Sequence, residues 1–169
     1  MLLDPARFPF VPTLEQRWRS IRDEVDRLRG GDFIEWYDRG AYSKGWNVYG
    51  LVATIHEARD RIDHDVRRRC PRTLELLDAI SGVQLAAFSV LEPGAVVFPH
   101  EDLDTGAVRC HLGLRVPVGA RLVIGDRELT WTEGRCLVFD NRYRHAAANE
   151  ASEPRIVLMI DVERSAYGI

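Results

Sequence analysis

The chain has 169 residues, of which 46% are hydrophobic and 29% are charged, and its formal net charge is −3. These values are typical of a single soluble globular domain with an apolar core. The small negative charge excludes a general electrostatic attraction to nucleic acid or to an anionic membrane surface. We therefore expect the binding partner to be a small molecule or a peptide, and neither nucleic acid nor a membrane.

The cysteines Cys70, Cys110 and Cys136 are odd in number and lack C-x-x-C spacing. This pattern argues against a disulfide framework or a zinc ribbon and fits a reducing compartment. The first residues do not have the pattern of a signal peptide, and no apolar run approaches the ~20 residues of a membrane helix. We expect a cytoplasmic protein, monomeric or homodimeric, with one domain over residues 1–169.

The first half of the chain mixes helical and strand patterns. Residues 1–12 are rich in proline and are expected to be irregular, whereas residues 13–28 have the apolar spacing of a helix and precede a glycine pair. Strands are expected at 33–37 and 46–52, and a second helix at 71–80. The charged stretch between them contains His64 and follows His56, and it is expected to be a solvated helix or loop.

From Val83 onward the pattern is almost entirely strand, with turn signals between the segments. Strands are expected over residues 83–91, 95–99, 109–116, 121–124, 128–131, 136–139, 144–148 and 156–162. Short strands at this spacing favour a mainly β protein with a double-stranded β-helix core, the jelly-roll or cupin-like barrel. Residues 1–80 would supply N-terminal helices and strands that pack on one sheet of the core, which is formed by residues 81–169.

A candidate metal site begins at His100-Glu101-Asp102. An extended backbone points residues two positions apart to the same side, so His100 and Asp102 would face one ion, although such a pair is also common in surface turns. His145, which follows the apolar strand 136–139, is the best candidate for a third ligand. Two imidazoles and one carboxylate on one side of a metal are typical of non-heme Fe(II) oxygenases, and they leave the opposite positions open.

A candidate site for an anion lies near the end of the chain. Arg155 opens an apolar final strand, where a buried guanidinium is costly unless an anion pairs with it. Its expected partner is the carboxylate of a ligand, bound through two parallel hydrogen bonds. Ser89, on a strand close to the site, could add a hydroxyl donor to the same carboxylate.

Residues 109–116 alternate between polar and apolar side chains, so Arg109, His111 and Arg115 share one face. In most strands such a face is exposed to solvent, but in a cupin-like barrel it can line the ligand pocket. The candidate substrate-binding residues are Arg109, Arg115, Trp46, Tyr49 and Tyr143. The three aromatic residues are equally compatible with ordinary core packing.

Several short motifs follow one another in a fixed order. They are Phe88-Ser89-Val90-Leu91-Glu92-Pro93-Gly94, Pro99-His100, Arg109-Cys110-His111-Leu112-Gly113-Leu114, Trp131-Thr132-Glu133-Gly134, Phe139-Asp140-Asn141, His145 and Arg155. His100 lies eleven residues after Ser89 and eleven before His111, and Arg155 lies ten residues after His145. In this order and spacing, from about Trp46 to Asp161, the chain resembles the aspartyl/asparaginyl β-hydroxylase family of Fe(II)- and 2-oxoglutarate-dependent oxygenases.

The resemblance implies roles for individual side chains. His100 and His145 would bind Fe(II), and Arg155 with Ser89 would bind the distal carboxylate of 2-oxoglutarate. Arg109 and His111 would face the iron-proximal end of 2-oxoglutarate or the substrate. The implied activity is that of a dioxygenase, which uses Fe(II), 2-oxoglutarate and O2.

Asp102 is where the chain departs from part of this family. The animal peptide hydroxylases have glycine at this position, whereas bacterial relatives that hydroxylate small amino acids carry the H-x-D pattern seen here. We therefore expect hydroxylation of an unactivated C–H bond in an amino acid, or in an amino-acid residue of a peptide or natural product.

Two other functions remain compatible with the same residues. A zinc-dependent cupin-type hydrolase or isomerase could use the two histidines and the aspartate, but it leaves Arg155 and Ser89 without a role. A non-catalytic cupin-like binding module would bind a ligand without turnover. A purely structural domain would bind no metal.

Overall fold

The computed structural model describes residues 1–54, 62–103 and 106–169. Its strands are β1 (Leu2–Leu3), β2 (Ile34–Glu35), β3 (Trp46–Ala53), β4 (Val83–Leu91), β5 (Val96–His100), β6 (Ala107–Arg115), β7 (Ala120–Ile124), β8 (Arg127–Leu129), β9 (Cys136–Phe139), β10 (His145–Asn149) and β11 (Arg155–Glu163). Its α-helices are α1 (Val11–Val25), α3 (Val66–Arg69) and α4 (Pro71–Asp78), and 3-10 turns cover Pro5–Arg7, Gly30–Asp32 and Arg164–Tyr167.

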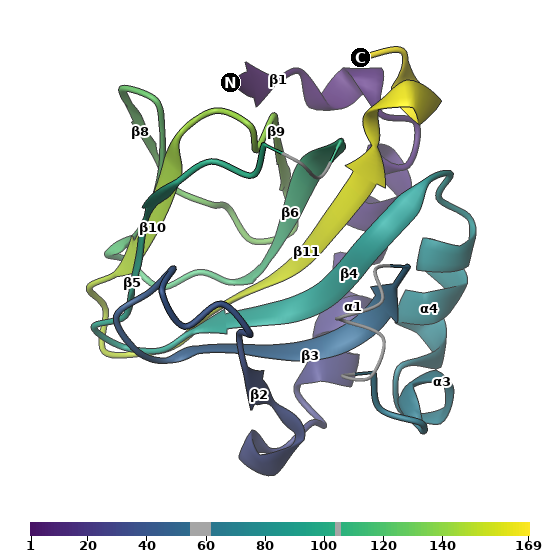
Figure 1. The fold of residues 1–169 in the computed structure, drawn as a ribbon. Helices are drawn as coiled ribbons and strands as arrows, with labels where there is room; N and C mark the ends of the chain where they lie inside the picture. Colours follow the sequence, from purple (N-terminus) through teal and green to yellow (C-terminus); the bar gives the residue numbers. More distant parts are fainter. Residues whose placement is uncertain (55–61, 104–105) are drawn as a thin grey trace.

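The strands form two antiparallel sheets that face each other (Figure 1). The larger sheet has seven strands in the order β1-β9-β6-β11-β4-β3-β2, and the smaller has four in the order β5-β10-β7-β8. From β4 to β11 the chain changes sheet at every step except β7 to β8, which is the topology of a jelly roll. The predicted mainly β fold with a cupin-like core is therefore confirmed.

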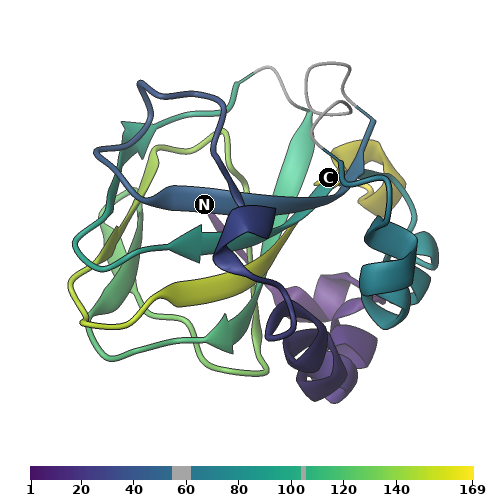
Figure 2. The same ribbon diagram turned by 90° about the horizontal axis from the view of Figure 1, so that it is seen from below.

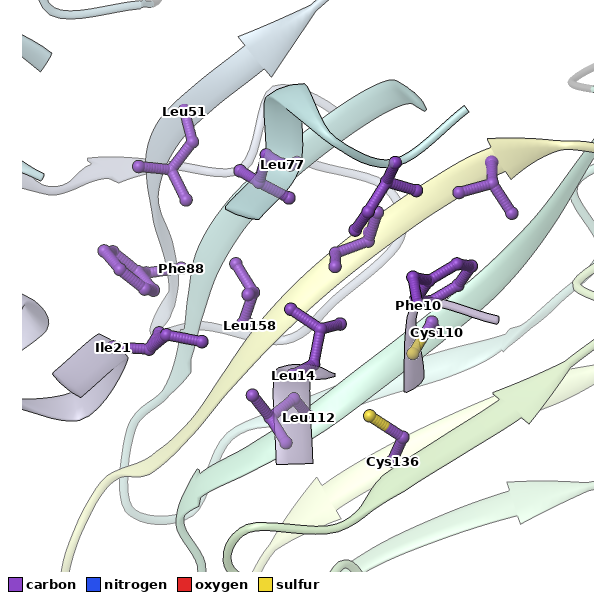
Figure 3. Close-up of a cluster of buried hydrophobic side chains, with 14 of the residues drawn as sticks. Phe10, Leu14, Ile21, Leu51, Leu77, Phe88, Cys110, Leu112, Cys136 and Leu158 are labelled. Atoms are coloured by element: carbon purple, nitrogen blue, oxygen red, sulfur yellow. The ribbon is translucent and has the colours of Figure 1, made fainter. Parts of the chain in front are cut away.

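Helices cover the outer face of the larger sheet, on the side away from the smaller sheet (Figures 1 and 2). The apolar side of α1 buries Leu14 and Ile21 in a cluster with Leu112 and Leu158 of the sheet (Figure 3). Cys110 belongs to the same cluster, as expected for the apolar face of β6. The predicted packing of N-terminal helices on one sheet is thus present.

A buried carboxylate joins the two main helices. Glu24 of α1 is 1% exposed, and it accepts hydrogen bonds from the backbone N–H groups of Arg72 and Thr73 at 2.9 Å each. The Thr73 hydroxyl also donates to it, at 2.6 Å. The first turn of a helix leaves its N–H groups without intrahelical partners, so Glu24 satisfies the start of α4 and fixes it against α1.

Some boundaries differ from the sequence-based expectation. Helix α1 begins at Val11 because Pro12 fits the first turn, where a backbone N–H is not needed. Strand β2 has only two residues, after which Trp36 turns inward to stack on Trp46. In the charged stretch, Val66–Arg69 is helical and His64 is exposed, whereas His56 lies outside the described residues.

The three cysteines are buried and are not joined by a disulfide. Among the described residues, no helix combines the length and the apolar character needed to cross a membrane.

Candidate metal centre

The three predicted metal ligands converge between the two sheets. His100 ends β5 and His145 begins β10, and these residues are direct partners in the antiparallel ladder. Asp102 lies two residues beyond β5, and one ligand atom from each of the three lies within 4.8 Å of the others. The Asp102 carboxylate is 3.7 Å from His100 Nε2 and 3.9 Å from His145 Nε2. Two atoms that each bind an ion at about 2.1 Å are at most about 4.2 Å apart, so both separations suit a shared metal.

Both histidines are oriented by the backbone. Nδ1 of His100 lies 2.8 Å from the Phe98 carbonyl, and Nδ1 of His145 lies 3.0 Å from the Tyr143 carbonyl. Each Nδ1 must donate to its carbonyl, so each Nε2 carries the lone pair that a metal requires. Nε2 of His145 is buried and has no hydrogen-bond partner among the described residues. Burial, and then the charges of Arg109 and His100, lower the pKa of His145 to about 4, which keeps it neutral.

A buried arginine holds the third ligand. Arg109 donates through Nε and Nη2 to Asp161, at 2.7 Å each, and its Nη1 lies 3.1 Å from Asp102 Oδ2. Asn141 Nδ2 donates to the same Asp102 oxygen at 3.1 Å. Burial by itself lowers the pKa of Arg109, but the carboxylates of Asp161 and Asp102 outweigh it and raise that pKa. Arg109 therefore orients a metal ligand, in addition to lining the cavity described next.

A small cavity adjoins these ligands. Small-molecule sites are typically apolar with a few converging polar groups, and the lining of this cavity has that character. The polar residues of its lining are Ser89, His100, Arg109, His111, His145 and Arg155, and the bulky apolar ones include Trp46, Trp131 and Met159.

Arg155 is the second buried cation of this cavity, and no acidic side chain in the described part of the protein pairs with it. It is 2% exposed, and its Nη1 makes a hydrogen bond of 3.3 Å to the carbonyl of Ser89. Its guanidinium lies 4.8 Å from the ring of Trp131, and Nε has no partner among the described residues. Burial lowers the pKa of Arg155 to about 9, and no acidic group among the described residues counteracts it. A desolvated cation of this kind favours an anionic ligand.

His111 presents a hydrogen-bond donor to the same cavity. Trp131 Nε1–H donates to His111 Nδ1 at 3.2 Å, so the neutral ring carries its hydrogen on Nε2. This Nε2 is buried and has no partner among the described residues. Burial, with the positive charges of Arg155 and Arg109, lowers the pKa of His111 well below its ordinary value. The cavity thus contains a neutral imidazole donor close to a cation.

Ser89 also keeps a donor for the cavity. Its Oγ accepts a hydrogen bond of 3.0 Å from Trp46 Nε1–H, which leaves the hydroxyl hydrogen for another acceptor. Trp46, predicted as a wall of the site, therefore lines the cavity and orients Ser89 as well.

The structure does not bring three of the candidate substrate residues to the cavity. Arg115 makes two hydrogen bonds with Asp26 at the end of α1, because β6 is irregular opposite Ile156 and the alternation of its faces is lost there. Tyr49 packs in the helix-facing cluster. The side chain of Tyr143 is exposed, and only its backbone carbonyl serves the site, through His145. These expectations of substrate contact are corrected accordingly.

Sequence reasoning assigned no role to Trp131, Asn141 or Asp161. Trp131 contacts both His111 and Arg155, Asn141 contacts Asp102, and Asp161 holds Arg109. Of these three residues, Asp161 is the one that the sequence could have identified, because an acidic residue within an apolar strand must have a buried partner.

Comparison with known proteins gives a consistent result. Residues 15–165 match the model of the family described as Aspartyl/Asparaginyl beta-hydroxylase. The chain is 42% identical over 166 residues to "Aspartate beta-hydroxylase domain-containing protein 2" of Mus musculus, covering 90% of this chain and 47% of that protein. It is 29% identical over 169 residues to "Ornithine lipid ester-linked acyl 2-hydroxylase" of Rhizobium tropici, covering 94% of this chain and 58% of that one.

The chain therefore spans about half the length of the curated relatives it matches. Among solved structures, a predicted oxalate decarboxylase from Thermotoga maritima superposes with a TM-score of 0.53 at 12% identity, over 80% of this chain and 97% of that one. This likeness supports the cupin-like fold.

Proposed function

The chain belongs to the aspartyl/asparaginyl β-hydroxylase family, and we propose that it is an Fe(II)- and 2-oxoglutarate-dependent dioxygenase. Its substrate in this proposal is an unactivated C–H bond of an amino acid, or of an amino-acid residue in a peptide or natural product. The observation that carries the proposal is the convergence of His100, Asp102 and His145 beside a cavity whose buried arginine, Arg155, has no carboxylate partner among the described residues.

Iron is proposed to bind His100 Nε2, His145 Nε2 and the Asp102 carboxylate. Two neutral imidazoles and one carboxylate leave a divalent ion with a net positive charge, which attracts an anionic cosubstrate. When bound, Fe(II) with 2-oxoglutarate and O2 supplies the oxidation of the C–H bond, and the protein supplies binding and orientation. Arg109 and Asn141 keep the Asp102 carboxylate in place.

Arg155 is proposed to bind the distal carboxylate of 2-oxoglutarate. Its guanidinium is already desolvated and already held against the ring of Trp131, so little further ordering is needed on binding. Ser89 donates its hydroxyl hydrogen to the same carboxylate. His111 donates through Nε2–H to the cosubstrate or the substrate, which satisfies a donor that is otherwise buried without a partner.

The test measures succinate formed from 2-oxoglutarate by the purified protein with Fe(II), O2 and a panel of amino acids. His100→Ala and His145→Ala should each abolish turnover. Arg155→Ala should weaken 2-oxoglutarate binding strongly and leave the iron content nearly unchanged. His64→Ala, at an exposed histidine, serves as the control and should change neither. Full activity in either ligand variant overturns the proposal.

The other two functions predict different outcomes in the same assay. A zinc-dependent hydrolase or isomerase would form no succinate and would lose activity on zinc removal rather than iron removal. A binding module would retain ligand binding without turnover.

A further inference from the structure

Two buried arginines line the cavity, and their surroundings differ. Arg109 is 6% exposed and Arg155 is 2% exposed. Arg109 contacts two carboxylates, whereas Arg155 meets none among the described residues. No lysine, aspartate or glutamate is among the lining residues that the structure describes. The capacity of the cavity for anions therefore depends on how much of the charge of each guanidinium is still available to a ligand.

Asp161 takes up the charge of Arg109 from the neighbouring strand. The two residues are ladder partners in β11 and β6, and Asp161 accepts two parallel hydrogen bonds of 2.7 Å from Nε and Nη2 of Arg109. This bidentate geometry is the strong form of an arginine–carboxylate pair. Asp161 is 5% exposed, so salt screens the pair weakly.

The same guanidinium also faces a second carboxylate. Its Nη1 lies 3.1 Å from Oδ2 of Asp102, the proposed metal ligand. With Asp161 on one edge and Asp102 at the other end, one cation is shared by two anions. Arg109 therefore has no net positive charge left for a ligand, although it lines the cavity.

The charges of the loaded site cancel. The two buried arginines carry one positive charge each, and Asp102 and Asp161 carry the matching negative charges. The proposed divalent ion is balanced by 2-oxoglutarate, whose two carboxyl groups are both ionised at neutral pH. A further carboxylate in this space would be a buried charge without a counter-charge, which is costly. An uncharged group brings no such cost.

The polar groups that remain in the cavity suit an uncharged group as well. Trp131 donates a hydrogen bond to Nδ1 of His111, so the ring is a neutral donor through Nε2–H. This Nε2 is buried and has no partner among the described residues. A neutral N–H donor can satisfy a carbonyl or hydroxyl oxygen without any change in charge.

We propose that the site selects a substrate whose part inside the cavity is uncharged, and that Asp161 sets this selectivity by neutralising Arg109. The inference rests on the proposed function, because the charge balance includes the ion and the cosubstrate. Aliphatic, hydroxyl-bearing and amide side chains meet this condition, whereas the side chains of aspartate and glutamate do not. Charged groups of the same substrate would remain outside the cavity, in contact with water.

Acetate and acetamide test this selectivity, because they share a shape and differ in charge. The protein is loaded with Mn(II) and 2-oxoglutarate, and the broadening of each probe's proton NMR signal by Mn(II) reports its binding near the metal. Wild type should bind acetate no more tightly than acetamide. Asp161→Asn adds one net positive charge to the site and should favour acetate over acetamide about tenfold relative to wild type. A preference for acetate in wild type, or no gain in Asp161→Asn, overturns the proposal.

The ratio of the two affinities separates selectivity from a merely structural role of Asp161, since a loosened site would weaken both probes. Asp26→Asn is the matched control, because it releases an exposed arginine, Arg115, from a similar bidentate pair. This control should leave the ratio unchanged. An equal change in Asp26→Asn and Asp161→Asn would contradict the assignment to Asp161. The wild-type measurement needs neither variant to fold.

A second measurement does not depend on the metal. In the metal-free protein without 2-oxoglutarate, acetate should bind through Arg155, and Arg155→Met should remove its preference over acetamide, because Arg109 is neutralised. A preference for acetate that persists in Arg155→Met overturns this inference, whether or not the protein forms succinate. Conversely, aspartate or glutamate as the best substrate in the succinate assay would overturn the selectivity and leave the dioxygenase proposal intact.

Discussion

At the residue scale, the dominant feature of the site is Arg155, a buried cation for which residues 1–54, 62–103 and 106–169 supply no carboxylate partner. Arg109 and Arg155 both line the cavity, but Arg109 is bound to Asp161 and Asp102, whereas burial alone acts on the pKa of Arg155. An uncompensated buried charge reduces stability and is retained where a ligand supplies the opposite charge.

Arg155→Met should therefore stabilise the ligand-free protein and destroy its affinity for 2-oxoglutarate. We expect a gain of about 1–2 kcal/mol in the free energy of unfolding, measured by urea denaturation. Arg115→Met is the matched control, because that exposed arginine is paired with Asp26, and it should change stability by less than about 0.5 kcal/mol. A large loss of stability in Arg155→Met would show that the guanidinium is already satisfied.

The buried histidines predict how stability depends on pH. The pKa of His111 is lowered in the folded protein, so this ring is neutral there, whereas the unfolded chain takes up a proton near pH 6.5. Below that pH the unfolded state binds more protons, so the metal-free protein should lose stability as the pH falls from about 7 to about 5. Each such group contributes at most about 1.4 kcal/mol per pH unit.

His111→Asn should make this loss of stability shallower, as measured by urea denaturation of the metal-free protein at several pH values. His64→Asn, at an exposed histidine, should leave the slope as it is in the wild type. Identical slopes for all three proteins would contradict the assignment of a neutral, buried His111.

At the element scale, the irregularity of β6 decides which residues reach the site. Arg109 and His111 face the cavity, but two positions beyond His111 the ladder with β11 shifts between Gly113 and Arg115. The alternation of side chains between the two faces of the strand, which the sequence predicted to extend to Arg115, is therefore interrupted before that residue. Such a bulge depends on what packs over the strand, which the alternation pattern does not contain.

Gly113 is the point at which this packing is tightest. A Cβ there would lie 2.4 Å from the carbonyl oxygen of Thr132, in the loop that also carries Trp131. Gly113→Ala should displace that loop, cost about 1–3 kcal/mol of stability and weaken 2-oxoglutarate binding through Trp131 and Arg155. Gly31→Ala has nothing within 4 Å of its Cβ and should be tolerated. Thermal unfolding and 2-oxoglutarate titration of both variants check the prediction, and equal tolerance would contradict it.

Most boundaries of the strands and helices could be predicted from the sequence to within a few residues. Val83–Leu91 and Cys136–Phe139 have the predicted bounds, because apolar runs between turn residues have few other ways to be buried. The weakest predictions lie at the edges of the fold. β2 is shorter than expected, because local propensity does not show that Trp36 turns inward to stack on Trp46.

At the scale of the whole molecule, the site exists only when the barrel is closed. His100 and His145 come from facing positions of two strands of the smaller sheet, whereas Arg155 opens a strand of the larger one. The unfolded chain does not hold these groups together, so metal and 2-oxoglutarate should bind the folded state alone and stabilise it.

Mn(II) with 2-oxoglutarate should therefore raise the midpoint of thermal unfolding. A ligand at a hundred times its Kd adds about 2.7 kcal/mol, which corresponds to about 5–10 °C for a domain of this size. EDTA should reverse the shift, and His145→Ala should not show it. An equal shift in His145→Ala would place the metal elsewhere.

The sequence by itself determined the jelly-roll core, the three metal-ligand candidates and the buried arginine, because periodicity, turn residues and ionisable residues in apolar strands are local signals. Only the tertiary structure decided that Arg109 holds Asp102, while Arg155 meets no carboxylate within the described part of the chain, and that both line one cavity. The physical reason is that pairing and hollow space depend on which strands become neighbours. Contacts between residues as distant in the chain as Arg109 and Asp161, or Gly50 and Ala87, are set by that arrangement.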